Sequence, residues 1–270
     1  MKIGIVVPGF SAHEGDWCIP ALLDLGRWLA RENDVRILAL RYPYQPGEYA
    51  VHGARVMALG GAARQRLGSA LLWRRAFATL SSMHRREPFD VLHAFWATEA
   101  GFIAALAGRR LGVPAVISLA GGELARLPDI GYGDQLRRAQ RLKIGLALRT
   151  ATMVTAGSRY LLDRARPWLR SRAADTVHRA PLGVDLNRFQ PGSMPVQADP
   201  PALIHAASLV PVKDQATLLR AAKILRERGQ RFTLEVAGGG PLEPELRRLT
   251  QALDLTNMVR FHGAVPHHDL

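Results

Sequence analysis

The sequence has little cysteine, little lysine and no long apolar run. Cys18 is its single cysteine, which excludes an intrachain disulfide and a CxxC metal site. No apolar run reaches the roughly 18–20 residues that span a bilayer. The apolar start over residues 1–8 is too short for a signal peptide and is typical of a buried first strand. From these absences we expect a cytoplasmic protein.

Arginine supplies most of the positive charge. Lysine occurs at four positions (2, 143, 213 and 223), whereas lysine and arginine together number 36 and the net charge is +13. A surplus of this kind suits a solvated surface, an anionic membrane or a diphosphate ligand, and these alternatives stay open. Because no recognised nucleic-acid module is present, we expect no nucleic-acid partner.

The pattern of apolar segments predicts an α/β protein with two domains. The 270 residues suffice for one large or two ordinary domains, and 48% of them are hydrophobic. Short apolar strands alternate with amphipathic helices along the chain, which favours parallel sheets. Residues 190–201 contain four prolines and few large apolar residues. We therefore predict a first domain at 1–189, a linker at 190–201 and a second domain at 202–270.

One βαβ unit near the C-terminus carries the strongest chemical signal. Strands at 202–207 and 232–237 flank a helix at 216–228, so both strands end at one edge of the sheet. Lys213 follows the first strand, and Gly238, Gly239 and Gly240 follow the second. A compact cation, closely approachable glycine amides and the start of a helix near Leu242 together suit a phosphate group.

Four segments resemble one enzyme family. They are APLGVDLNRF at 180–189, AASLVPVKDQ at 206–215, VAGGGPL at 236–242 and VRFHG at 259–263. Their order and spacing are similar to those of the retaining glycosyltransferases of family 4, also called group 1. The resemblance implies the GT-B fold, in which two Rossmann-like domains face each other across a cleft.

The resemblance implies transfer of a sugar from a nucleotide-diphosphate donor with retention of configuration. It requires no metal or other cofactor, since a cation and helix N-termini neutralise the phosphates. Lys213 and the glycines at 238, 239 and 240 are the expected donor-binding residues, together with Ser208, where the family usually has an arginine. The acceptor is expected to be a saccharide or a lipid-linked molecule.

The same resemblance places acceptor-side residues in the first domain. Gly9 and Gly15 lie in the loop after the first strand, and Gly121, Gly122 and Glu123 follow a later strand. Glu123 could bind sugar hydroxyls or cap the local backbone. His93 is a weak catalytic candidate or a hydrogen-bonded residue at a strand end, because Phe95 replaces the family's second histidine.

Two other functions and a peripheral contact stay open. A non-catalytic GT-B-like binding protein would fit the departures at Phe95, Ala120 and Ser208, and a nucleotide-sugar 2-epimerase would need proton-moving groups such as His93 and Glu123. Residues 61–87 form a basic amphipathic segment that suits either a solvated helix or contact with an anionic membrane at its inner face.

The resemblance further implies a donor-binding Glu-x7-Glu pair in the later part of the second domain, past residue 270. We therefore interpret the chain as a fragment with an incomplete second domain, and expect it to lack full activity.

Overall fold

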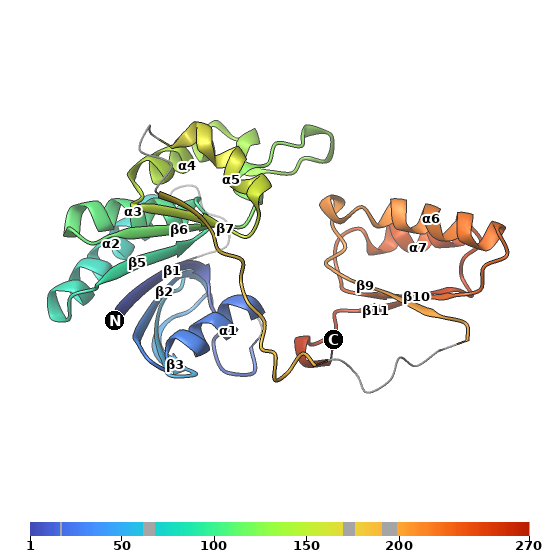
Figure 1. Cartoon of the computed structure of the whole chain (residues 1–270), viewed down its shortest axis with the longest axis horizontal. Coiled ribbons are helices and arrows are strands. Elements are labelled where there is room, and N and C mark those ends of the chain that lie inside the picture. The colour runs from blue at the N-terminus through green and yellow to red at the C-terminus, as the bar shows by residue number, and fades with distance from the viewer. Residues whose placement is uncertain (17, 62–67, 170–175, 191–198, 270) are drawn as a thin grey trace. The chain divides into compact units, whose positions relative to one another are not determined.

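The computed structural model describes residues 1–16, 18–61, 68–169, 176–190 and 199–269 (Figure 1). The chain divides into two compact units, Met1–Phe189 and Gln190–Leu270. Most of the predicted linker, residues 191–198, lies outside the described residues, as does the start of the predicted basic helix, residues 62–67.

Within the described residues, the first unit is built on an eight-stranded sheet in the order β3-β4-β2-β1-β5-β6-β7-β8. β3 pairs antiparallel with β4, and the other neighbouring strands run parallel. The strands are β1 (Lys2–Gly9), β2 (Asp34–Tyr42), β3 (Pro46–Val51), β4 (Ala54–Leu59), β5 (Val91–Phe95), β6 (Ala115–Leu119), β7 (Met153–Ala156) and β8 (Val177–Arg179).

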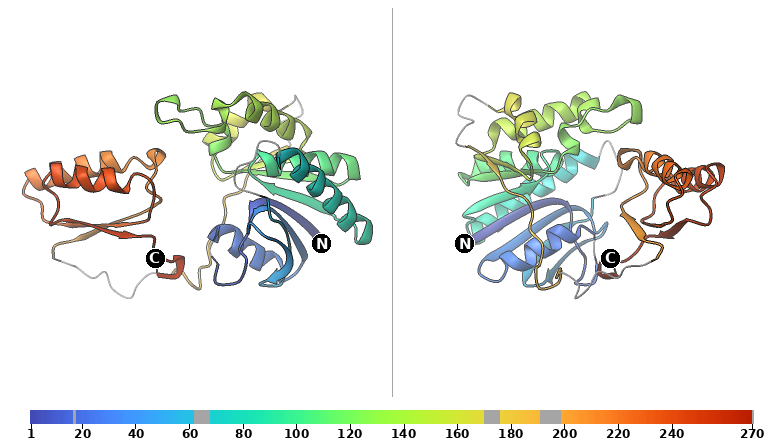
Figure 2. Two further views of the ribbon diagram at one scale, coloured as in Figure 1. Left: turned by 180° about the vertical axis from the view of Figure 1, so that it is seen from behind. Right: turned by 45° about the vertical axis from the view of Figure 1, so that its right-hand side comes forward.

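Helices cover both faces of this sheet (Figures 1 and 2). They are α1 (Pro20–Leu29), α2 (Gly68–Arg86), α3 (Glu99–Leu111), α4 (Arg138–Thr150) and α5 (Arg159–Ala165). Successive side chains of a strand point to opposite faces. In β1, Val6 packs in a cluster with α2 and α3, whereas Ile5 and Val7 pack in a second cluster with α1. Burial on both faces explains why β1 is an unbroken apolar run.

The prolines and glycine of residues 41–47 are typical of a loop, but only residues 43–45 lie outside strands. β2 continues through Tyr42, and β3 begins at Pro46 and returns as β4. His52 (φ 46°) and Gly53 (φ 83°) form the two-residue hairpin turn between them, which requires left-handed backbone at both positions. Pro46 and Gly47 are typical of loops, but a proline is tolerated at the first residue of an edge strand.

Short 3-10 turns adjoin two of these helices. α4 begins at Arg138, after a 3-10 turn at Asp134–Leu136. α5 ends at Ala165, where Pro167 enters a 3-10 turn and cannot donate a backbone hydrogen bond. A serine directly before an amphipathic segment is typical of an N-cap, and Ser158 Oγ accepts a hydrogen bond from the Leu161 amide (3.3 Å).

In its described part, the second unit has three parallel strands in the order β11-β10-β9. They are β9 (Ala202–Ala206), β10 (Thr233–Ala237) and β11 (Val259–Gly263), with helices α6 (Gln215–Glu227) and α7 (Glu243–Ala252). Both helices lie on one face of the sheet (Figure 1) and pack on Leu234, Val236 and Val259. On the other face, Glu235 pairs with His262 (2.6 Å) and Arg260 (3.5 Å), and Ile204 is 69% exposed.

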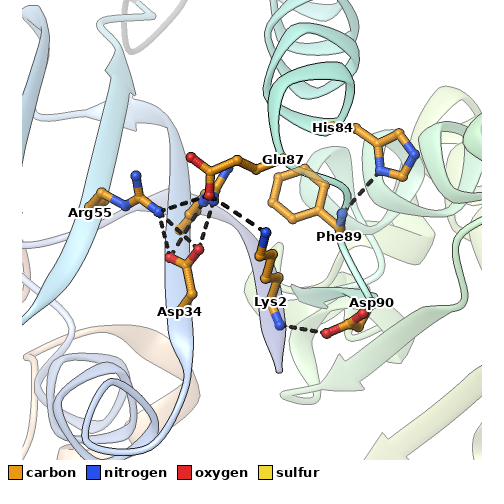
Figure 3. A network of polar contacts seen from close by, with 8 residues as sticks. Lys2, Asp34, Arg55, His84, Glu87, Phe89 and Asp90 are labelled. Atoms are coloured by element: carbon orange, nitrogen blue, oxygen red, sulfur yellow. Dashed lines mark hydrogen bonds and ion pairs between the residues drawn. The ribbon is translucent and has the colours of Figure 1, made fainter.

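A network of ion pairs joins elements at the amino ends of the first sheet (Figure 3). Arg36 is buried, binds Asp34 at 2.6 Å and also pairs with Glu87 at the end of α2. Arg55 of β4 binds Asp34 at 2.7 Å, and the Lys2 amide donates to Asp90 (2.7 Å). These contacts tie β1, β2, β4 and α2 together at the edge opposite to the one where α/β folds bind ligands.

Candidate functional site

The loops after β9 and β10 lie together at one edge of the second sheet. The two strands are parallel neighbours, with Ala206 opposite Ala237. Past the strand ends, the Leu209 amide donates to the Gly239 carbonyl (3.0 Å), and the Leu242 amide donates to the Leu209 carbonyl (3.2 Å). These two loops carry the residues predicted to bind the donor. They are Ser208, Lys213, Gly238, Gly239 and Gly240.

The three glycines of the second loop differ in their packing. Gly238 has φ 140°, and a Cβ there would lie 2.0 Å from the Ala207 carbonyl oxygen. A Cβ at Gly240 would lie 2.4 Å from the Leu209 carbonyl oxygen, whereas the nearest atom to a Cβ at Gly239 is 3.8 Å away. The close approach of the two loops therefore requires Gly238 and Gly240, whereas a Cβ at Gly239 would make only ordinary van der Waals contact with Ala264.

The backbone amides of this loop also differ. The Gly238 amide donates to the Gly263 carbonyl (2.7 Å). Among the described residues, the amides of Gly239 and Gly240 donate to no protein acceptor. Adjacent free amides can accept an anion, as in the backbone nests that bind phosphate.

Lys213 lies where the first loop enters α6. It ends a 3-10 turn, Pro211–Lys213, and Asp214 then caps the helix in the left-handed conformation (φ 49°). Lys213 is exposed and pairs with no carboxylate in the described part of the chain. The first turn of α6 has no acidic side chain. An anion beside this helix start would meet the Lys213 ammonium, whereas the helix N-terminus itself is capped by the Asp214 carboxylate, which accepts from the Thr217 amide (3.4 Å).

The backbone of Ser208 is held by the buried side-chain amide of Gln215. Gln215, 2% exposed, donates through Nε2 to the Ser208 carbonyl (3.0 Å) and contacts His205 Nε2 at 3.3 Å.

The start of α7 differs from that of α6, because Glu243 and Glu245 occupy its first turn. Their charge balances the positive end that the sequence assigned to this helix, and the Asp214 cap does the same at α6. Lys213 and the free loop amides are therefore better placed than either helix start to meet a phosphate.

In the first unit, the loop after β1 is held by its own polar contacts. A Cβ at Gly9 would lie 2.9 Å from the Tyr42 Cβ, so β1 and β2 need a glycine there. Asp16, next to Gly15, accepts hydrogen bonds from the Ala12 amide (2.7 Å) and from Tyr42 Oη (2.8 Å). The hydrogen bond from Tyr42 to Asp16, together with burial, raises the pKa of Tyr42 to about 12. Asp16 was not among the predicted site residues.

His93 joins a chain of side chains that crosses three strands. Its Nε2 lies 2.7 Å from Ser118 Oγ of β6, which lies 2.6 Å from Thr155 Oγ1 of β7. Burial lowers the pKa of His93 to about 4, so the ring is neutral at pH 7. Its contacts match the strand-end alternative considered for this residue. The sequence pattern did not indicate Ser118 or Thr155.

Glu123 is fully buried and its carboxylate binds the backbone. It accepts hydrogen bonds from the amides of Ala97 (3.4 Å), Ala120 (3.0 Å) and Gly121 (2.6 Å). Gly121 has φ 119°, a conformation that favours glycine. The carboxylate thus has the backbone-capping role, the second of the two alternatives considered for it, and shapes the loop that Gly121 and Gly122 form.

The helix α2 places its tryptophan inward. Trp73 Nε1 donates to Glu99 Oε1 (2.7 Å), and its ring lies 5.1 Å from that of Phe102. Trp73 therefore serves the packing of α2 on α3. Leu71 is 62% exposed, and the arginines of α2 (74, 75, 85 and 86) form no ion pair among the described residues.

Among the described residues, no group of three or more histidine, cysteine or acidic side chains could hold a metal ion. A search of the same residues finds no helix with the length and apolar character to cross a membrane.

Two family models match the chain in succession. A glycosyl transferase 4-like domain matches residues 19–183, and a glycosyl transferases group 1 domain matches residues 188–270. EpsF of Bacillus subtilis, named as a glycosyltransferase, is 30% identical over 187 residues, which are 65% of this chain and 47% of EpsF. A GDP-mannose-dependent alpha-(1-6)-phosphatidylinositol monomannoside mannosyltransferase of Mycolicibacterium smegmatis is 33% identical over 128 residues, 44% of this chain and 33% of that protein. The chain thus spans less than half of these relatives.

Solved structures share the fold across the whole chain. A sucrose-phosphate synthase from Thermosynechococcus elongatus matches with a TM-score of 0.72 and 17% identity, covering 100% of this chain and 72% of that one. A UDP-N-acetylglucosamine 2-epimerase from Listeria monocytogenes matches with a TM-score of 0.58 and 13% identity, covering 100% and 71%. At these identities the matches establish the fold, and the predicted GT-B class is confirmed.

Proposed function

The chain belongs to the group 1 glycosyltransferases, and from that premise we propose that it moves a sugar from a nucleotide-diphosphate donor to an acceptor, with retention of configuration. The donor would bind to the second unit, and the acceptor to the first. Because the chain spans less than half of the curated relatives it matches, the activity of the whole protein is part of this proposal.

The observation that supports this most directly is the pair of joined loops in the second unit. The Gly239 and Gly240 amides lack a protein acceptor among the described residues, and the exposed Lys213, in the turn just before α6, pairs with no carboxylate there. Such fixed positive groups stabilise the charge that develops on a leaving diphosphate, without reorganising during the reaction. We propose that Lys213 and these amides take this role, and that no metal is needed for it.

The acceptor is proposed to be a saccharide or a lipid-linked molecule. The mycobacterial relative is named for GDP-mannose and for a phosphatidylinositol monomannoside, which supports a nucleotide-diphosphate donor and a lipid-linked acceptor. The sugar and the base of the donor for this chain are to be identified by a screen.

The test of the donor site is calorimetry with UDP and GDP on the 270-residue chain. Lys213→Ala should abolish nucleotide binding, because it removes the cation at the start of α6. Lys223→Ala is the matched control: Lys223 lies on the same helix, pairs with Glu227 (3.5 Å) and should leave affinity unchanged. Equal affinity in the two variants and the parent would refute the role of Lys213.

A donor screen separates the proposal from the two other functions. Each nucleotide sugar is incubated with the protein and the products are separated by chromatography. Release of free sugar or transfer supports a glycosyltransferase, and a changed sugar on an intact nucleotide indicates an epimerase. Binding without turnover indicates a non-catalytic protein only when the protein tested has the full length of its curated relatives. The epimerase alternative is the weaker, since His93 is held neutral and Glu123 binds three backbone amides.

We also propose that α2 contacts an anionic membrane. A groove of about 820 Å³ between α2 and α3 has Phe77 and Leu106 in its lining, together with four arginines (74, 85, 109 and 110). Apolar contact combined with arginine charge favours anionic lipid. Flotation with phosphatidylglycerol vesicles at low salt should carry the protein upward, and Arg74→Glu with Arg85→Glu should prevent it. Absence of flotation in the parent chain would refute this contact.

A further inference from the structure

The first unit contains a pocket at the carboxyl ends of β6 and β7, lined in part by Gly121, which the resemblance placed on the acceptor side without naming the chemistry of the acceptor. Its volume is about 310 Å³. One wall is the loop after β6, from Ala120 to Leu127, and the other is the start of α5 after β7. β6 and β7 are parallel neighbours, with Leu119 opposite Ala156, so both walls stand at the edge where open α/β sheets bind ligands.

The loop that forms the first wall is rigidly held. The buried Glu123 carboxylate binds the amides of Ala120 and Gly121, and Gln135 Nε2 donates to the Glu123 carbonyl (2.7 Å). Arg164 Nη2, from α5, donates to the Leu124 carbonyl (3.1 Å) and so joins the two walls. A site whose walls are fixed before a ligand arrives loses less free energy to ordering when it binds.

Two arginines make the pocket positively charged. Arg126 lines it from the loop and Arg164 from α5, and no acidic side chain is among the described residues that line it. Neither guanidinium pairs with a carboxylate in the described part of the chain. Each guanidinium carries five N–H donors in a planar fork that matches a carboxylate or a phosphate, and the Leu124 carbonyl accepts from Arg164 through one nitrogen.

An exposed aromatic ring completes the arrangement. Tyr160 also lines the pocket, is 69% exposed, and has its ring centroid 5.8 Å from the Arg164 guanidinium carbon. A tyrosine presents an apolar face and a polar hydroxyl, which suits the mixed surface of a sugar ring. The volume is at the small end of the about 300–1,000 Å³ typical of ligand pockets, which fits one charged sugar unit.

We propose that this pocket binds the anionic group of a saccharide acceptor, held by Arg126 and Arg164 beside Tyr160. The proposal rests on the glycosyltransferase function and adds a substrate class to it: an acceptor whose sugar carries a carboxylate or a phosphate. A uronic acid would supply the first, and a sugar phosphate the second.

The test is saturation-transfer NMR and titration of the 270-residue chain, without nucleotide, using glucuronic acid, glucose 6-phosphate and neutral glucose. One or both anionic sugars should bind and glucose should not; which of the two binds identifies the anionic group. Binding of neither, or equal binding of glucose, would overturn the proposal.

Variants assign the binding to the pocket. Arg126→Ala and Arg164→Gln should each weaken the anionic sugar by about tenfold or more, as expected when a charge-assisted hydrogen bond is lost. Arg126 has no protein partner among the described residues, so its variant should fold normally even if Arg164→Gln does not. Arg159→Ala removes an exposed arginine of the same helix that does not line the pocket and should change nothing. Unchanged affinity in Arg126→Ala would overturn the proposal.

This outcome is separable from that of the donor test. If UDP or GDP binds through Lys213 but no anionic sugar binds, the acceptor inference fails and the proposed function stands. If the anionic sugar binds and no nucleotide does, the pocket is a saccharide site and the proposed transfer reaction fails.

Discussion

The ligand-binding edges of the two sheets differ in how far their polar groups are already bound by the protein. In the first unit, Glu123 holds backbone amides, Asp16 holds its loop and His93 joins Ser118. In the second, the Gly239 and Gly240 amides and the Lys213 ammonium have no protein partner among the described residues. Residues of similar appearance in the sequence thus serve structure at one edge and remain available to a ligand at the other.

The largest test of this comparison sets Glu123 against Lys213. Glu123→Ala leaves three amides without their acceptor, and each unpaired buried group costs about 1–3 kcal/mol, so we expect a loss of about 3 kcal/mol or more in the free energy of unfolding. Lys213→Ala should change it by less than about 0.5 kcal/mol. Urea denaturation and hydrogen exchange measure both. A similarly small loss of unfolding free energy in both variants would show that the polar groups of the first edge are no more engaged by the protein than those of the second.

His93 provides a pH test of the first edge. Its pKa in the folded protein is about 4, below the 6.5 of the exposed group, so the unfolded state binds a proton first as the pH falls. Stability should therefore be full above pH 6.5 and decline toward pH 4, by up to about 3 kcal/mol. In His93→Gln this contribution to the decline of stability between pH 6.5 and pH 4 should be absent. NMR titration of the ring with an inflection near 6.5 would contradict the buried, neutral assignment.

Two glycine variants sharpen the account of the second edge. Gly240→Ala should cost about 1–3 kcal/mol, because its Cβ would collide with the Leu209 carbonyl. Gly239→Ala should leave the melting temperature nearly unchanged, because its Cβ would meet no protein atom closer than 3.8 Å. It should weaken the binding of UDP or GDP, because the added methyl group would stand beside the free amides proposed to bind the phosphate. Thermal denaturation and calorimetry on both variants check this. Unchanged nucleotide affinity in Gly239→Ala would remove this loop from the donor site.

The smallest effect is expected at the opposite, amino-end edge of the first sheet. Hydrogen bonds from Arg36 lower the pKa of Asp34 to about 2, with Arg55 contributing. The stabilisation is present above pH 4 and is lost as the pH falls toward 2. Because the buried Arg36 would keep Glu87 as its remaining partner and Arg55 is largely exposed, we expect Asp34→Asn to cost about 1–2 kcal/mol near pH 7. Equal acid sensitivity of the variant and the parent would show that this network adds nothing.

The sequence predicted elements that depend on local pattern. The apolar run of β1, the periodicity of α3 and α6 and the Ser158 cap were readable, because each is set by neighbours in the chain. The β3–β4 hairpin was missed, since its turn is the unusual pair His52 and Gly53 and its first strand begins with a proline.

The roles of the site residues were harder to predict from the sequence, because they depend on contacts between segments that are far apart in the chain. The pattern marked Glu123 as a candidate but did not decide between its two roles, since the carboxylate folds back onto amides of two loops. Arg126 and Arg164 are far apart in the chain and meet because β6 and β7 are neighbours. A useful signal would have been any arginine shortly after a predicted strand of a parallel sheet.

The exposure of β9 has a consequence for handling this polypeptide. Among the described residues, β9 is an edge strand of its sheet, and its Ile204 side chain is 69% exposed. An extended segment from another molecule can therefore pair with the outer edge of β9. Natural edge strands are commonly guarded by lysine. Replacing Ile204 by lysine should therefore raise the concentration at which the purified chain stays monomeric, and would make it a better sample for the titrations above.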